Sequence, residues 1–61
     1  MNKINHKWHQ QLVEIEKVCS VHLMALELET TEKRVNDFLQ EIEEPSHALK
    51  AAIEFLWREY C

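Results

Sequence analysis

Residues 29–35 read ETTEKRV, and the chain is expected to reverse its direction there. At about 100° per residue, the apolar side chains before this stretch fall on one helical stripe, and those after it fall on a stripe nearly opposite. One straight helix cannot turn both stripes toward a single core. Thr30 and Thr31 are β-branched residues that can cap a new helix, and Glu32 would then lie favourably in its first turn. The sequence therefore predicts that one helix ends near Glu29 and another starts at Thr31.

The first stripe indicates one long amphipathic helix, expected over residues 3–29, with Asn2 or Asn5 as its N-cap. Its members are Ile4, Trp8, Leu12, Ile15, Val18, Cys19, His22 and Leu26. The second stripe occupies the rest of the chain, and its members are Val35, Phe38, Leu39, Ile42, Leu49, Ala52, Ile53, Leu56 and Tyr60. Both stripes have the helical spacing that turns one face of a helix toward a core.

Pro45 interrupts the second stripe without changing its phase. Inside a helix, a proline removes a hydrogen bond, clashes with the preceding turn and costs about 3 kcal/mol. We therefore expect helices over residues 31–43 and 45–60, with Pro45 at the first position of the latter. These two pieces can run on as one bent arm, or the chain can fold back at Pro45. The predicted fold class is all-α: a helical hairpin in a single domain, residues 1–61, with a three-helix bundle as the alternative.

The composition supports a small helical domain. The chain has 61 residues, no glycine and one proline, so it lacks the turn residues that a sheet needs between its strands. Its hydrophobic content of 46% and charged content of 30% are typical of folded chains rather than of disordered ones. A chain of this length buries only about 60% of the surface that its unfolded form exposes, so we expect a partner chain to contribute to its stability.

Residues 21–28 read VHLMALEL and carry apolar side chains on two sides of the first helix. Val21, Met24 and Leu28 lie opposite the first stripe, so this helix needs a second cover. A second subunit can supply that cover, and a homodimer that forms a four-helix bundle is the simplest closed arrangement. Aromatic residues near the C-terminal end are typical anchors for a partner. The predicted interface consists of Val21, Met24, Leu28, Phe55, Trp57 and Tyr60, and the alternative is that all six are ordinary core residues.

Cys19 and His22 are three residues apart on the first stripe, a spacing at which a thiolate and an imidazole can share a metal ion. The competing interpretation is a buried cysteine beside a hydrogen-bonded histidine. Two further pairs have a ligand spacing, and these are His6 with His9 and Glu44 with His47. The first pair is expected to be solvated, and the second contains Pro45 and points off the stripe. Because the sequence has no glycine-rich phosphate loop and no nucleophile motif, we expect a protein that is not an enzyme and has no cofactor.

The net charge of −4 disfavours nucleic acid as a partner, because phosphate backbones attract basic surfaces. The alternative function, an RNA- or DNA-binding hairpin dimer, would depend on two clusters. Their residues are Lys3, Lys7 and Trp8, and separately Lys33 and Arg34. Glutamates at positions 27, 29 and 32 crowd the second cluster, so both are expected to be solvated helix faces.

The sequence predicts neither a disulfide nor a membrane segment. The spacing of Cys19 and Cys61 does not indicate a bridge, and a reducing compartment would keep both as thiols. The longest stretch without a charged residue, residues 18–26, is far shorter than the roughly 20 residues of a membrane span. No apolar signal region follows the first residues. The predicted protein is therefore a cytoplasmic regulator or adaptor that acts by binding another protein.

Overall fold

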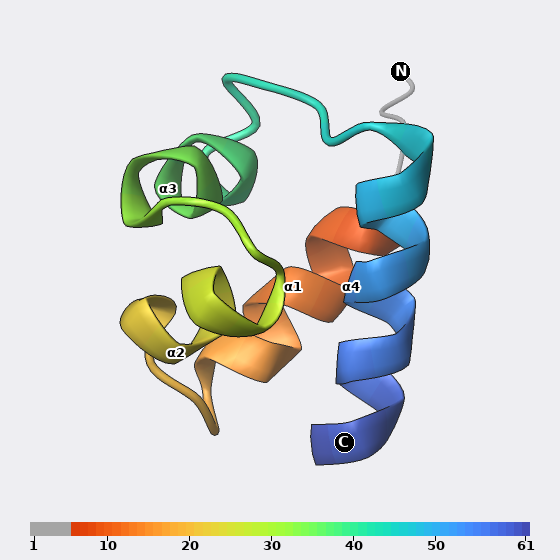
Figure 1. Ribbon diagram of the computed structural model, residues 1–61. Coiled ribbons are helices and arrows are strands. Elements are labelled where there is room, and N and C mark those ends of the chain that lie inside the picture. Colours follow the sequence, from red (N-terminus) through yellow and green to blue (C-terminus); the bar gives the residue numbers. More distant parts are fainter. Residues whose placement is uncertain (1–5) are drawn as a thin grey trace.

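The computed structural model describes residues 6–61 of the chain. They form four α-helices joined by short connections (Figure 1). They are α1 (Lys7–Glu16), α2 (Val21–Glu27), α3 (Glu32–Leu39) and α4 (His47–Tyr60). No strand occurs among residues 6–61, which confirms the predicted all-α class. Within the same residues, no helix is both long enough and apolar enough to cross a membrane.

The prediction of a single helix over residues 3–29 is wrong, because the helix is interrupted between α1 and α2. Ser20 has an extended conformation, with φ −71° and ψ 159°, and its hydroxyl accepts a hydrogen bond from the Leu23 amide at 3.1 Å. This contact caps α2, and a capping serine offers the backbone an alternative to a continuing helix. A continuous helix of the predicted length would measure about 40 Å, whereas the longest extent of the molecule is 34 Å.

The start of the first helix also differs from the expectation. α1 begins at Lys7, and the preceding His6 is extended and makes no capping hydrogen bond through its side chain. The residues expected at this end, Asn2, Lys3, Ile4 and Asn5, lie outside the described residues.

The reversal near Glu29 is confirmed. Thr31 is the N-cap of α3, its hydroxyl accepts a hydrogen bond from the Arg34 amide at 3.2 Å, and Glu32 lies in the first turn. On the other side of the turn, Glu29 takes a left-handed conformation with φ 57°. Its amide donates to the Leu26 carbonyl at 3.2 Å. The next amide, that of residue 30, donates to the carbonyl of residue 25 at 2.9 Å, which completes a Schellman motif.

Pro45 separates two helices, so the single bent arm does not form. α3 ends at Leu39 instead of residue 43, and Glu41 beyond it has a φ of 61°. α4 begins at His47 after Ser46, whose hydroxyl accepts a hydrogen bond from the amide of residue 49 at 3.2 Å. Pro45 therefore precedes the N-cap and does not occupy the first helical position. The predicted end of this helix near residue 60 is confirmed.

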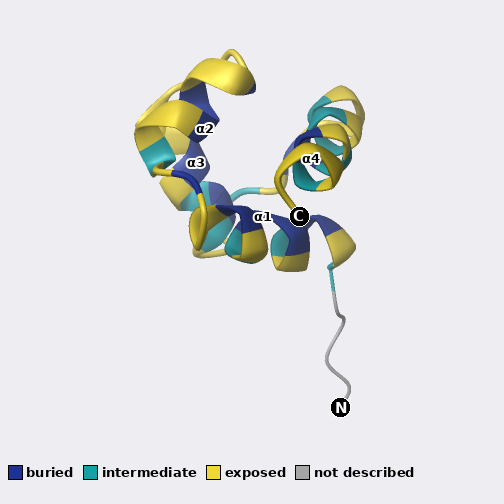
Figure 2. Ribbon diagram, turned by 90° about the horizontal axis from the view of Figure 1, so that it is seen from below, coloured by how far each residue is buried: buried dark blue, intermediate teal, exposed yellow. Residues whose placement is uncertain are grey.

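α1 is the centre of the fold. It packs against each of the other three helices, and α2 packs against α3. Figure 2 shows α2 and α3 together over one end of α1 and α4 over its other end, with their buried faces turned toward the interior. The buried apolar residues are Trp8, Leu12, Ile15, Cys19, Met24, Ala25, Leu28, Val35, Phe38, Ile53 and Leu56. A hairpin of two long arms, or a bundle of three helices, thus has too few helices to describe this chain.

The break before α2 changes which side of residues 21–28 is buried. Met24 is fully buried and Leu28 is 5% exposed, and Val21 packs against the same core. The side that was expected to need a second subunit is therefore covered by the chain itself. Tyr60, at the end of α4, is exposed instead, and so are four further members of the predicted stripes, which are Val18, His22, Leu26 and Ile42. These four lie in the connections after α1 and α3 or on the outer face of the reoriented α2.

Candidate functional site

A groove of about 450 Å³ lies where the end of α2 approaches the C-terminal half of α4. Its lining residues are Glu27 from α2 and Ala52, Phe55, Leu56, Glu59 and Tyr60 from α4. The α4 residues reach the groove together because they follow one another at helical spacing, on the side of the helix next to its buried face. The groove thus combines an apolar surface with two carboxylates.

Phe55 is the most exposed aromatic side chain of this surface. Its relative exposure is 67%, and that of Tyr60 is 41%. Phe55 also lines a second, shallower hollow of about 320 Å³ that Ala51, Glu54 and Arg58 complete. A large ring between two hollows, beside small alanines, offers a partner both an apolar contact and room for its own side chains.

The two carboxylates of the groove carry negative charge that no ion pair among the described residues offsets. Among residues 6–61, neither Glu27 nor Glu59 forms an ion pair. By contrast, the neighbouring Glu54 pairs with Arg58 at 3.0 Å. Repulsion from unpaired carboxylates is expected to act on any acidic group nearby.

The titration of nearby groups reflects this negative charge. Partial burial raises the pKa of Tyr60, and the charges of Glu27, of Cys19 when ionised and of Glu59 raise it further. Burial, and then the charge of Glu27, also raises the pKa of the Cys19 thiol. Both groups are therefore neutral at physiological pH, and the charge of the groove comes from Glu27 and Glu59.

The structure divides the predicted interface residues into two groups. Phe55 and Tyr60 come together in the groove. Met24 and Leu28 are core residues of the single chain, so a partner cannot reach them in the folded protein. Trp57 is half-buried against the core on another side of α4, and its Nε1 donates a hydrogen bond to Glu14 at 2.7 Å. This bond ties α4 to α1, which gives Trp57 a structural role.

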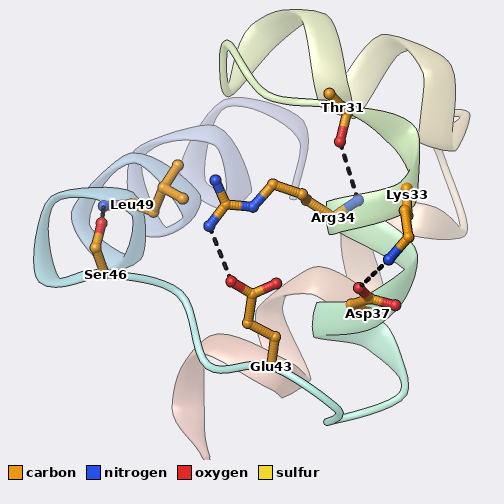
Figure 3. A network of polar contacts seen from close by, with 7 residues as sticks. All are labelled: Thr31, Lys33, Arg34, Asp37, Glu43, Ser46 and Leu49. Atoms are coloured by element: carbon orange, nitrogen blue, oxygen red, sulfur yellow. Dashed lines mark hydrogen bonds and ion pairs between the residues drawn. The ribbon is translucent and has the colours of Figure 1, made fainter.

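Among residues 6–61, the members of the predicted basic clusters are paired with carboxylates or buried in the core, apart from Lys7. Figure 3 shows Lys33 paired with Asp37 at 3.0 Å and Arg34 paired with Glu43 at 2.9 Å. The Arg34 guanidinium also lies 5.8 Å from the centre of the Phe38 ring. In the other cluster, Trp8 is 6% exposed and cannot stack on a base, Lys7 is exposed, and Lys3 lies outside the described residues.

The metal pair Cys19 and His22 is not brought together as a site. Cys19 is buried, whereas His22 is exposed and its Nδ1 lies 2.7 Å from an oxygen of Glu32. Among residues 6–61, no group of three or more metal-binding side chains is assembled. Within these residues, the single chain thus offers neither a third nor a fourth ligand of the kind that a structural zinc ion requires.

The other histidine pairs have structural surroundings. His9 was expected to be solvated, but it is half-buried and its Nε2 donates to the Leu39 carbonyl at 2.7 Å. This hydrogen bond satisfies a free carbonyl at the end of α3. His6 is also half-buried and stacks on Trp8, with 5.2 Å between ring centres. In the remaining pair, Glu44 forms an ion pair with Lys50, and the histidine at position 47 is exposed.

Sequence reasoning missed the charged part of the groove. Glu27 and Glu59 lie on different helices, and each alone has the pattern of an ordinary solvated glutamate. They lie beside the same apolar surface only because α2 approaches α4 in the folded chain. Comparison of the chain with family models, with curated proteins and with solved structures finds no match in any of the three.

Proposed function

We propose that this chain is a small non-enzymatic regulator or adaptor that binds another protein through the groove between α2 and α4. The observation that carries the proposal is the 67% exposure of Phe55 beside a groove, in a chain whose own core already buries its other phenylalanine completely. Exposed aromatic residues beside a hollow are typical anchors of protein interfaces. The core does not need Phe55, so a partner is the natural cover for it.

The side chains that could take part in catalysis make other contacts or are buried, which supports a non-enzymatic function. His9 holds the end of α3, His22 contacts Glu32, and the Cys19 thiol is buried and neutral. A nucleophile requires a base and an orienting group around an accessible cavity. These residues are dispersed over the fold, and the groove contains none of them.

The size of the molecule is sufficient for a specific interface. A standard complex buries about 800 Å² on each partner, and the accessible surface of the chain is 4245 Å². One partner would therefore cover roughly a fifth of the surface. The groove, the Phe55 ring and the exposed Leu26 of α2 are the apolar part of such an area.

If the chain forms a homodimer, this proposal requires the two copies to contact each other through the same groove. The original reason for a homodimer was the uncovered side of α2, and Met24 and Leu28 on that side are now buried in the chain itself. A homodimer would have to bury Phe55 and Tyr60 instead. Two copies would then bring four unpaired glutamates together, which opposes the contact. We therefore favour a different protein as the partner, located in the same cytoplasmic compartment.

Site-specific photo-crosslinking in the native cells tests the proposal. A benzophenone amino acid at position 55 is expected to yield a covalent adduct with a larger protein, whereas the same group at Lys33 is not. Lys33 is a suitable control because its side chain is 84% exposed and lies on α3, away from the groove. Equal adducts at both positions, or none at position 55, would contradict the proposal. An adduct of only twice the 7.4 kDa of the chain would assign the surface to a homodimer.

A further inference from the structure

The groove between α2 and α4 has a chemical character that specifies its partner more closely. Ala52, Phe55 and Leu56 give it an apolar surface, and Glu27 and Glu59 place carboxylates in the same lining. Every Lys and Arg that forms an ion pair within residues 6–61 pairs with a different carboxylate. The groove therefore presents an apolar surface with uncompensated negative charge.

We infer that this groove binds an amphipathic, basic helix of another protein, with an aliphatic side chain against Ala52, Phe55 and Leu56 and a lysine or arginine beside Glu27 and Glu59. This inference rests on the proposed function, since it names the chemistry of the partner for the same surface. The inference goes beyond the proposed function, because a partner protein could contact Phe55 without contacting Glu27 or Glu59.

The shape of the groove favours a helix as the bound element. Its α4 wall carries a small residue, Ala52, next to Phe55, and a second small residue, Ala51, lines the adjoining hollow that Phe55 shares. Small residues let another helix backbone approach closely, and the Phe55 ring then fits between side chains of that helix. α4 has 14 residues and is thus about 21 Å long. The part of α4 that lines the groove, residues 52–60, is about 12 Å long, so a helix of the partner lying along it can contact it over about two turns.

The charge of the groove favours a basic partner. Glu27 and Glu59 are exposed and lie beside apolar side chains, and they attract an opposite charge that a partner brings close to them. Burial raises the pKa of Tyr60 in the groove wall, and the charges of Glu27 and Glu59 raise it further. A lysine or arginine supplied by the partner would neutralise these charges and would also steer the encounter. An acidic or neutral helix would leave both carboxylates unpaired.

A displayed library of helical peptides tests the inference. The peptides have about 18 residues, or about five turns, with a fixed aliphatic stripe and random polar positions. Selection against the full chain is expected to enrich lysine and arginine next to the stripe. In fluorescence anisotropy, the double variant E27Q/E59Q should weaken binding of the selected peptides about 10-fold, which corresponds to the loss of two partly exposed ion pairs. The control E16Q/E29Q removes the same charge away from the groove and should leave the affinity unchanged.

A charge-reversal experiment makes the test independent of any loss of folding. The variant E27K/E59K should bind the selected peptides in which glutamate replaces lysine and arginine, which an unfolded protein cannot do. The inference is overturned if no peptide is enriched, if the enriched peptides are not basic, or if E27Q/E59Q binds them as well as the natural chain does. If the adduct at position 55 forms equally in E27Q/E59Q, the adaptor function stands and the basic helix is wrong. If neither adduct nor peptide appears, both proposals fail.

Discussion

The two phenylalanines of this chain should respond in opposite ways to the same substitution. Phe38 is fully buried, whereas Phe55 is 67% exposed. Replacing a buried phenylalanine by alanine costs about 3–5 kcal/mol. The contact of the Phe38 ring with the Arg34 guanidinium, at 5.8 Å, adds about 0.5–1 kcal/mol to that loss. A chain of 61 residues has a total stability of roughly 3–9 kcal/mol, so Phe38→Ala is expected to remove most of it.

The same arithmetic gives a small effect for Phe55→Ala. Complete burial of a phenylalanine contributes about 1.5–3 kcal/mol, and only about one third of this side chain is buried, so the loss is about 0.5–1 kcal/mol. Alanine has a better helix propensity than phenylalanine by about 0.5 kcal/mol, which offsets much of it. We therefore expect the free energy of unfolding of this variant to stay within about 0.5 kcal/mol of the natural chain.

Urea denaturation followed by far-ultraviolet circular dichroism measures both effects. The slope of the transition should be the same for the natural chain and Phe55→Ala, because neither folded nor unfolded state changes much. A loss of more than about 2 kcal/mol in Phe55→Ala would assign Phe55 to a core and refute the free groove. If that loss shrank on dilution, a homodimer would be burying the ring, because dilution dissociates a dimer and removes the stability that it adds. A loss below about 1 kcal/mol in Phe38→Ala would refute the packing of the core itself.

Four further predictions concern particular residues. A thiol reagent at mildly alkaline pH should modify Cys61 rapidly and the buried Cys19 only after denaturation, so native protein should react at one thiol and unfolded protein at two. Tyr60 is the only tyrosine, so its pKa can be read from tyrosinate absorbance, and Glu27→Gln should lower that pKa toward the ordinary value. Because folding raises the pKa of Cys19 and of Tyr60, the stability that depends on their neutral forms is complete below their unfolded values. It should therefore fall as the pH rises above about 8.5–10. Finally, Glu29→Gly should raise the free energy of unfolding by about 1 kcal/mol in the same urea titration, because glycine accepts a φ of 57° without strain.

The sequence predicted the part of the fold that depends on local signals. The all-α class follows from composition and periodicity. The reversal at Glu29 was visible because the apolar stripe changes phase there, and Thr31 with Glu32 in the following turn has the pattern of a helix start. Such signals act within a few residues, so they need no knowledge of the rest of the chain.

The break before Ser20 could not be predicted in this way. The uncharged stretch around it continues the first stripe, and a single serine is a weak signal beside a run of good helical spacing. α2 has only seven residues and would not be stable alone. It forms because Met24 and Leu28 pack into the core that α1 and α3 provide, so its position is decided by tertiary contacts.

The groove shows the same division between local and distant information. Phe55 and Tyr60 were predicted as anchors because large aromatic side chains near a helix end are conspicuous in a sequence. Met24 and Leu28 were predicted with them only because the helix was drawn too long. The placement of Glu27 and Glu59 beside one groove has no signal in the sequence, since helical periodicity relates residues within one element and not between elements.

The absence of glycine explains why the helix ends were the hardest features to place. Most Schellman motifs use glycine at the left-handed position, and this chain uses Glu29 and Glu41 instead, with φ values of 57° and 61°. A non-glycine residue in this conformation costs about 1–2 kcal/mol. The conformational cost of the two turns is therefore large beside a total stability of roughly 3–9 kcal/mol. Local preference alone would not form them. They must be held by the core on either side, where Leu28 precedes the first turn and Phe38 precedes the second. A loss of packing at either residue should thus release its turn as well as its helix, so helix ends and core are expected to unfold in one transition.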